Sequence, residues 1–244
     1  MSSQRGRLYA AVSSSAAVWS VWLGTAVDDP LAGQAEIAGE RGRPRNLLAT
    51  LQALLGARGA GLGDVAGFAL DVGPGSFTGL RSGMAAVRAL AWAQSIPVCA
   101  VPCWHAMAYA AQPGPQQGVL CAVRARAGVW YLARWPDRAP QAVAMDDVDG
   151  WLRHVARPGD RTAGCAWLDQ DLARAAAAAA VQVSHSGAGD CDARSIATVA
   201  LAGPSHAWTD AIAAIPSYVA DSEAENRPPT APMPPCSGLP ERAQ

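Results

Sequence analysis

The chain has 244 residues, half of them hydrophobic, and its formal net charge at pH 7 is −1. This length accommodates one large domain or two lobes with a substantial core. The near-zero charge excludes bulk electrostatic attraction to nucleic acid or to an anionic membrane. All 19 basic residues are arginine, so mechanisms that need a lysine Schiff base or a P-loop lysine are excluded as well.

The six cysteines are scattered without a repeated CxxC spacing, which is unlike the disulfide framework of a small secreted domain. The first residues are polar and make a poor signal peptide. No uninterrupted apolar stretch reaches the roughly 18 residues that a membrane span requires. We therefore expect a cytoplasmic protein without membrane contact.

The first half of the chain is expected to begin with three strands and then to alternate between helices and strands. Runs rich in Val, Trp and Tyr at 8–12 and 17–23, separated by three serines, predict a β-hairpin. A third strand is expected at 34–38. Leucines at helical spacing predict a helix ending near residue 58. The pattern then predicts a strand over 65–70, a helix over 78–94, a strand over 98–101 and a helix over 104–111.

The proline- and glycine-rich segment 112–118 predicts a boundary between lobes. Beyond it we expect strands at 119–123, 129–134, 161–166 and 181–183, and helices at 146–155, 168–180 and 193–202. The proline-rich residues 223–244 predict a disordered tail. The expected organisation is α/β, with an N-terminal lobe over 1–111 and a C-terminal lobe over 112–222.

The most distinctive stretch lies between the strand at 65–70 and the helix at 78–94. Such a junction can bring backbone N–H groups and the positive end of a helix dipole to one point. It matches neither the Walker A loop nor the dinucleotide-binding fingerprint. Two interpretations stay open, a phosphate site and a packing corner. In the second, the turn residues are structural, glycine permits close approach, and Ser76 or Thr78 caps the helix. These turn residues are Gly73, Pro74, Gly75, Ser76, Thr78 and Gly79.

Few residues suggest catalysis. The paired aspartates at 28–29 and 146–149 stand in turns or helix starts, where carboxylates favour the helix dipole. Cys99, Cys103 and His105 form C-x₃-C-x-H, which is not a zinc spacing. The other histidines are isolated. We therefore predict no catalytic, metal-binding or cofactor-binding residue in this chain.

Residues 73–83, Gly-Pro-Gly-Ser-Phe-Thr-Gly-Leu-Arg-Ser-Gly, closely resemble the G-P-G-S-F-T-G-x-R-x-G signature of the TsaB (YeaZ) family of bacterial tRNA threonylcarbamoyladenosine biosynthesis. The similarity continues through 85–91 and 96–98. Residues 122–131 look like a degraded form of the family's A-x-D-A-R-x-G-x-x-Y segment, and 216–218 resemble its late P-x-Y. The resemblance spans about residues 7–222, and its central part is specific.

The resemblance implies a two-lobed actin-like ATPase fold with ribonuclease-H-like lobes, as in actin, sugar kinases and heat-shock ATPases. It implies a non-catalytic subunit that forms a heterodimer with the catalytic subunit TsaD, while the ATPase TsaE joins the complex. That complex transfers threonylcarbamoyl to N6 of adenosine 37 in tRNAs reading ANN codons. ATP and zinc or iron are implied on the partner subunits and no cofactor in this chain. The tRNA is contacted indirectly, and the chain can form a homodimer when alone.

The implied partner contact lies on the two helices that flank the signature. Its residues are Leu47, Leu51, Leu54, Leu80, Arg81, Met84, Val87, Arg88 and Ala91.

The chain departs from the family at three places. The opening strand, which usually ends in Asp-Thr-Ser, ends here in Val12-Ser13-Ser14, so its carboxylate is missing. Arg124 replaces the later Asp, and 43–46 replace a basic-His-Ser segment. Opening-strand carboxylates organise Mg²⁺ and phosphate in ATPases of this fold, so their loss fits a subunit without a nucleotide of its own. The alternatives are an enzyme of related fold, such as a small-molecule kinase or a metal-dependent peptidase, and a homodimer that has lost its partner.

Overall fold

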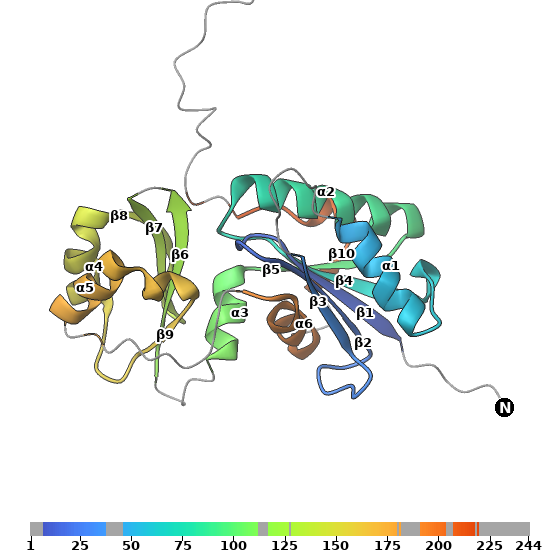
Figure 1. Cartoon of the computed structure of the whole chain (residues 1–244), viewed down its shortest axis with the longest axis horizontal. Coiled ribbons are helices and arrows are strands. Elements are labelled where there is room, and N and C mark those ends of the chain that lie inside the picture. Colours follow the sequence, from blue (N-terminus) through green and yellow to red (C-terminus); the bar gives the residue numbers. More distant parts are fainter. Residues whose placement is uncertain are drawn as a thin grey trace, which may run out of the picture.

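The computed structural model describes residues 7–37, 46–111, 117–126, 128–179, 181, 191–203, 207–217 and 219. Two lobes, each built on its own sheet, lie side by side (Figure 1). Within the described residues, no helix is both long enough and apolar enough to cross a bilayer.

The first lobe is built on a six-stranded mixed sheet with the order β10-β5-β4-β1-β2-β3. Strands β1, β4 and β5 are parallel, while β2, β3 and β10 each run antiparallel to their neighbour. The predicted hairpin is confirmed as β1 and β2. The strands are β1 (Leu8–Ser13), β2 (Trp19–Gly24), β3 (Gly33–Ile37), β4 (Val65–Asp71), β5 (Val98–Val101) and β10 (Trp208–Thr209).

Helices cover both faces of this sheet (Figure 1). Helices α1 (Leu47–Ala57) and α2 (Phe77–Gln94) lie on one face, and α3 (Cys103–Ala110) and α6 (Ala193–Ala202) lie on the other. Because successive side chains of a strand point to opposite faces, Ala10 and Val12 join the core under α1 and α2, whereas Ala11 joins the core against α3 and α6. This explains why β1 carries apolar or aromatic residues at every position from 8 to 12.

The second lobe has a four-stranded sheet with the order β8-β7-β6-β9. Helices α4 (Val148–Val155) and α5 (Gln170–Ala178) share a core with it. The apolar cluster around α3 also includes Val119 and Cys121 of β6 and Ala163 of β9, so this helix packs against both sheets. The strands are β6 (Val119–Arg126), β7 (Val129–Trp135), β8 (Arg138–Ala144) and β9 (Arg161–Ala163), and the 3₁₀ turns of the chain include η1 (Leu62–Asp64), η2 (Met145–Asp147), η3 (Cys165–Leu168) and η5 (Ala211–Ala213).

Two sequence-based predictions of organisation need correction. The C-terminal lobe does not extend to residue 222, because α6 packs on β1, β2 and β4, and β10 pairs with β5 of the first sheet. Strands β8 and β10 were not predicted. Strand β8 is a mostly exposed edge strand, and β10 has only two residues and pairs with β5, which is distant in sequence. The predicted strand at 181–183 falls mostly outside the described residues, as does the tail 223–244.

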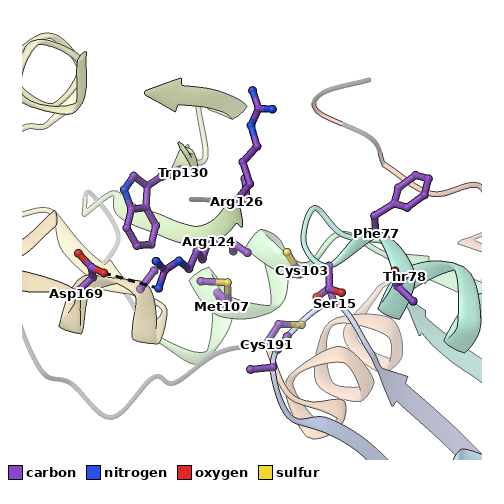
Figure 2. A pocket seen from close by; sticks show the side chains of 16 residues that line it. Ser15, Phe77, Thr78, Cys103, Met107, Arg124, Arg126, Trp130, Asp169 and Cys191 are labelled. Carbon is purple, nitrogen blue, oxygen red and sulfur yellow. Dashed lines mark ion pairs between the residues drawn. The ribbon is translucent and has the colours of Figure 1, made fainter. Parts of the chain in front are cut away.

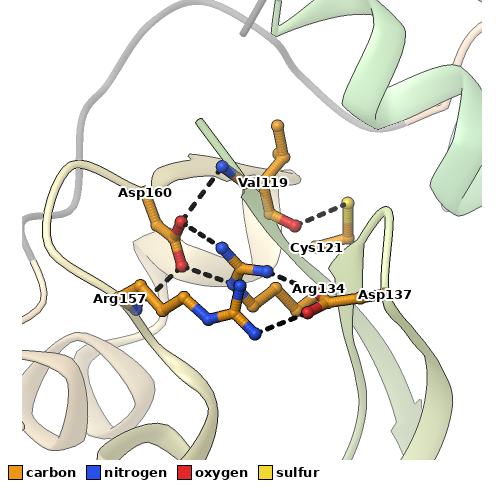
Figure 3. A network of polar contacts seen from close by, with 7 residues as sticks. Val119, Cys121, Arg134, Asp137, Arg157 and Asp160 are labelled. Atoms are coloured by element: carbon orange, nitrogen blue, oxygen red, sulfur yellow. Dashed lines mark hydrogen bonds and ion pairs between the residues drawn. The ribbon is translucent and has the colours of Figure 1, made fainter. Parts of the chain in front are cut away.

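A buried ion pair lies where the chain enters the second lobe (Figure 3). Arg134 donates from Nε and Nη2 to the two carboxylate oxygens of Asp160 at 2.7 and 2.8 Å, and both side chains are about 5% exposed. Asp160 also accepts from the backbone N–H of Gly118 and of Arg157. Arg161 in turn donates to the carbonyl of Ala111. The segment that joins the lobes is therefore held at both ends by neighbouring residues 160 and 161.

Replacing Asp160 with Asn should lower the free energy of unfolding by about 2 kcal/mol, because it leaves the buried Arg134 with Asp137 as its remaining charged partner. Chemical denaturation measures this directly. Asp171→Asn is the matched control, since its ion pair with Arg174 is exposed and should contribute under about 0.5 kcal/mol. Equal effects of the two substitutions would contradict the assignment.

Candidate functional site

A buried carboxylate connects the ends of two parallel strands. Asp71, the last residue of β4, is fully buried. Its Oδ2 accepts from the backbone N–H of Ser15 at 3.0 Å and of Ser14 at 3.3 Å, and its Oδ1 accepts from the N–H of Gly73 at 2.8 Å. One side chain therefore holds both the serine loop after β1 and the first glycine of the signature turn.

No role for Asp71 was predicted from the sequence. Burial raises the pKa of its carboxyl, and the hydrogen bonds from Ser15, Gly73 and Ser14 only partly offset this effect. A carboxylate therefore does lie beside the end of the opening strand, although it comes from β4 rather than β1. Two features of the sequence could have indicated this contact. Asp71 ends an apolar strand, and three serines stand at the end of the opening strand, which is its parallel neighbour.

The signature glycines pack directly on the serine loop. A Cβ atom added to Gly79 would lie 2.1 Å from the carbonyl oxygen of Ser14, and one added to Gly75 would lie 2.5 Å from that of Ser15. A Cβ on Gly83, one turn further along α2, would lie 2.2 Å from Ser14 Oγ. Only glycine allows α2 to approach the loop this closely.

Three N–H groups of the turn, those of Gly73, Ser76 and Gly79, are used within the chain. Ser76 donates its N–H to the carbonyl of Ser15 at 2.8 Å, and its side chain caps α2 by accepting from the N–H of Gly79 at 3.2 Å. The N–H of Gly73 is held by Asp71. A phosphate cradle needs such groups to point at the ligand. Of the two interpretations left open by the sequence, the geometry favours the packing corner.

A cleft of about 650 Å³ separates the lobes (Figure 2). The serine loop and the start of α2 form one wall, α3 forms the floor, and β6, β7 and η3 form the other wall. Its charged side chains are Arg124, Arg126 and Asp169. The remaining lining is mostly small, with Phe77, Met107 and Trp130 as the larger members.

The polar groups of the cleft are largely occupied by the chain itself. Asp169 caps α5 by accepting from the N–H groups of Asp171 and Leu172, and its other oxygen lies 3.9 Å from Arg124. Cys103 donates its thiol to the carbonyl of Pro74, and burial raises the pKa of the Cys191 thiol. Among the residues that the structure describes, no cluster of three His, Cys, Asp or Glu side chains could hold a metal ion.

The predicted partner residues do not all reach the surface. Six of them are at most 4% exposed, and all six except Leu80 belong to the core under α1 and α2. Their burial corrects their assignment as contact residues: Leu47, Leu51, Leu80, Met84, Val87 and Ala91. Leu54 is half-buried and packs against the same core. Arg81 is exposed and Arg88 is half-buried. The helical spacing identified the apolar stripe, but the sheet beneath these helices covers it.

The sides of α1 and α2 that point away from the sheet form what we call the outer helical face. It is made mostly of small uncharged residues, and α1 has no ionisable side chain at all. Leu48 is 46% exposed and Trp92 is 72% exposed. The face consists of Leu48, Ala49, Gln52, Ala53, Gly56, Arg81, Ser82, Ala85, Arg88, Ala89 and Trp92.

The two lobes, each an α/β layer on its own sheet, place the protein in the actin-like, ribonuclease-H-like class. The family model described as TsaD, tRNA N6-adenosine threonylcarbamoyltransferase, matches residues 39–188, and the chain belongs to that family. Comparison with curated proteins finds no match.

Solved structures of Pseudomonas aeruginosa proteins have the same fold. An uncharacterized protein with similarity to the peptidase YeaZ superposes with a TM-score of 0.65 at 21% identity, over 87% of this chain and 99% of that one. YeaZ itself superposes with a TM-score of 0.63 at 22% identity, over 86% and 99%. The predicted fold and the resemblance to YeaZ are confirmed.

Replacing Gly79 with Ala should destabilise the protein by about 1–3 kcal/mol, because the new methyl group would overlap the backbone carbonyl of Ser14. Gly56→Ala in α1 is the control, because no atom lies within 4 Å of the added Cβ. That change should stabilise the helix by up to about 1 kcal/mol. Thermal and chemical unfolding of both variants should show changes in stability of opposite sign. A stabilising effect of Gly79→Ala would contradict the close approach of α2 to the carbonyl of Ser14.

The buried carboxyl of Asp71 should give a pH-dependent contribution to stability. Because its folded pKa is raised, this contribution is fully present below the unfolded pKa of about 3.9 and is lost as pH rises through the folded value. The difference in unfolding free energy between the wild type and Asp71→Asn isolates this group. We expect the wild type to lose stability relative to the variant as pH rises from about 4 over the range in which both proteins stay folded. A difference in unfolding free energy that stays constant over this range would rule out a raised pKa for Asp71.

Proposed function

We propose that this chain is a non-catalytic subunit that binds and activates a TsaD-like catalytic subunit. The pair would transfer threonylcarbamoyl to N6 of adenosine 37 in ANN-decoding tRNAs in the cytoplasm. A TsaE-like ATPase would join through the complex, and the tRNA would be contacted indirectly. ATP and zinc or iron would belong to the partner subunits.

The outer helical face is the observation that carries this proposal. A helix that lies on the surface of a soluble protein normally presents charged residues to water. On α1 the outward positions are instead occupied by Leu48, Ala49, Gln52 and Ala53. Small side chains allow the close approach of another helix, and α1 and α2 together offer two neighbouring ridges for such packing. This surface is suited to a second protein.

The positions of the carboxylates in and beside the cleft support an accessory role rather than an independent enzymatic one. Asp71 is buried beneath the serine loop, and Asp169 caps a helix. Neither carboxylate is placed as a free general base, which would need to reach a proton of the substrate. The alternative is an enzyme of related fold, a kinase or a peptidase. The matched family is described as a transferase, and one of the similar structures is described as resembling a peptidase, so this alternative is tested as well.

Reconstitution tests the proposal directly. The cognate TsaD-like and TsaE-like subunits, threonylcarbamoyl-AMP and an ANN-decoding tRNA would be assayed with and without this chain. We expect co-purification with the TsaD-like subunit and a rate of modification that depends on the added chain. Modification, peptide cleavage or phosphoryl transfer by the chain alone would support the enzymatic alternative.

The substitution Ala53→Glu should reduce affinity for the TsaD-like subunit at least about tenfold, because it places a long charged side chain in a close helix contact. Stimulation of tRNA modification should fall in parallel, whereas the melting temperature should stay unchanged, since Ala53 is exposed. Ala177→Glu on the exposed side of α5 is the control. Unchanged binding by Ala53→Glu would place the partner elsewhere.

A further inference from the structure

We propose that three sulfur-bearing side chains at the floor of the cleft form a binding site for a soft metal ion, Cu(I). They belong to Cys103, Met107 and Cys191, and we call them the sulfur site. This inference is independent of the proposed function, because the cleft is lined by residues other than those of the outer helical face. It differs from the sequence-based prediction that no residue of the chain binds a metal.

The sulfur site combines one helix with a segment that is distant in sequence. Cys103 and Met107 stand four positions apart on α3, so their side chains lie on the same side of that helix. Cys191 comes from the chain just before α6. All three residues line the cleft, and each is at most 4% exposed. Figure 2 shows them together at the floor of the cleft.

The two thiols belong to one group of buried polar side chains. Cys103 acts electrostatically on Cys191, and so does the buried carboxyl of Asp71. The hydroxyl of Ser13 connects these groups, since it lies 2.7 Å from the carbonyl oxygen of Cys191 and 3.2 Å from Asp71 Oδ2. Carbonyl oxygens, a carboxyl and thiols attract a cation, and each thiol can exchange its proton for a metal ion.

The side chains on α3 are held in place by the surrounding chain. The backbone N–H of Cys103 donates to the carbonyl of Gly73 at 2.8 Å, and its thiol donates to the carbonyl of Pro74 at 2.9 Å. The terminal methyl of Met107 fills the space beside Gly164, where an added Cβ would lie 2.6 Å from it. Ligands that are fixed in this way lose little freedom when an ion binds.

The electrostatic position of Cys103 favours a thiolate. It is the first residue of α3, so its sulfur lies near the positive end of the helix dipole, which stabilises negative charge. A metal ion takes the place of the thiol proton, and the bond from the thiol to the carbonyl of Pro74 is then lost. The bond from the backbone N–H of Cys103 to Gly73 does not depend on that proton.

The donor atoms select the kind of ion. Two thiols and one thioether are soft ligands, and soft sulfur ligands select Cu(I). Structural zinc sites require four ligands, and magnesium and calcium require oxygen ligands. Among the described residues that line the cleft, Asp169 is the only one with a carboxylate, and it caps α5. The site therefore fits an ion that accepts three sulfur atoms.

Two further buried cysteines provide a comparison. Cys99 and Cys121 are free thiols like Cys103 and Cys191, but neither of them lines the cleft. Cys99 lies on β5 within the core, and the thiol of Cys121 lies 3.5 Å from the carbonyl oxygen of Trp104. An ion from solvent reaches the sulfur site through the cleft, so burial alone does not distinguish these cysteines, whereas access does.

Titration of the full chain with Cu(I) alone tests the sulfur site. The experiment is anaerobic, and a chromogenic Cu(I) chelator competes for the ion. We expect one ion per chain. Cys103→Ser and Cys191→Ser should each weaken binding about 100-fold or more, and Met107→Leu, which keeps the side-chain volume, about tenfold. An ion that binds the folded chain also raises its melting temperature, and this increase should disappear in both serine variants.

Control variants separate the sulfur site from the other cysteines. Cys99→Ala, and a double variant with Cys165→Ser and Cys236→Ser, should keep the wild-type affinity for Cu(I). Melting temperatures without metal verify that each variant is folded. Wild-type affinity in folded Cys103→Ser or Cys191→Ser would overturn the site, and so would loss of binding in the Cys165 and Cys236 variant. Wild-type affinity in Met107→Leu would overturn the coordination by three sulfur atoms.

Discussion

The structure depends on one buried carboxylate. Asp71 ends β4 and holds the N–H groups of Ser14, Ser15 and Gly73, so it fixes the loop after β1 and the start of the signature turn together. A buried carboxyl is costly unless donors surround it, and three backbone donors do so here. Its position sets where the serine loop lies, and the loop sets how closely α2 can approach the sheet.

The glycines of the turn are the counterpart of this constraint. Gly75, Gly79 and Gly83 leave space for the carbonyls and hydroxyl of the serine loop. The absence of side chains at these glycines therefore allows α2 to pack closely against the serine loop. One consequence is that the inner side of α2 becomes core, with Leu80, Met84 and Val87 under 5% exposed. Its outer side remains uncovered by the described chain.

The two sides of α2 thus have different physical roles. The inner side stabilises the lobe through burial of apolar area, and the outer side, with α1, is the surface on which the proposed partner would pack. The cleft between the lobes is lined by a different set of residues. Its wall residues, including Asp169 and Cys103, serve helix capping and the attachment of α3 to the turn.

The alternation of strands and helices, the strand-turn-helix corner at 71–94 and the family resemblance could all be predicted from the amino-acid sequence, because period and glycine spacing are local properties of the chain. The apolar stripe of α2 could be predicted as well. That this stripe faces the sheet follows only from the folded structure, since helical periodicity cannot say which side is covered by the chain and which by a partner. The return of α6 and β10 to the first lobe, and the carboxylate that Asp71 brings beside β1, likewise depend on contacts between residues far apart in sequence.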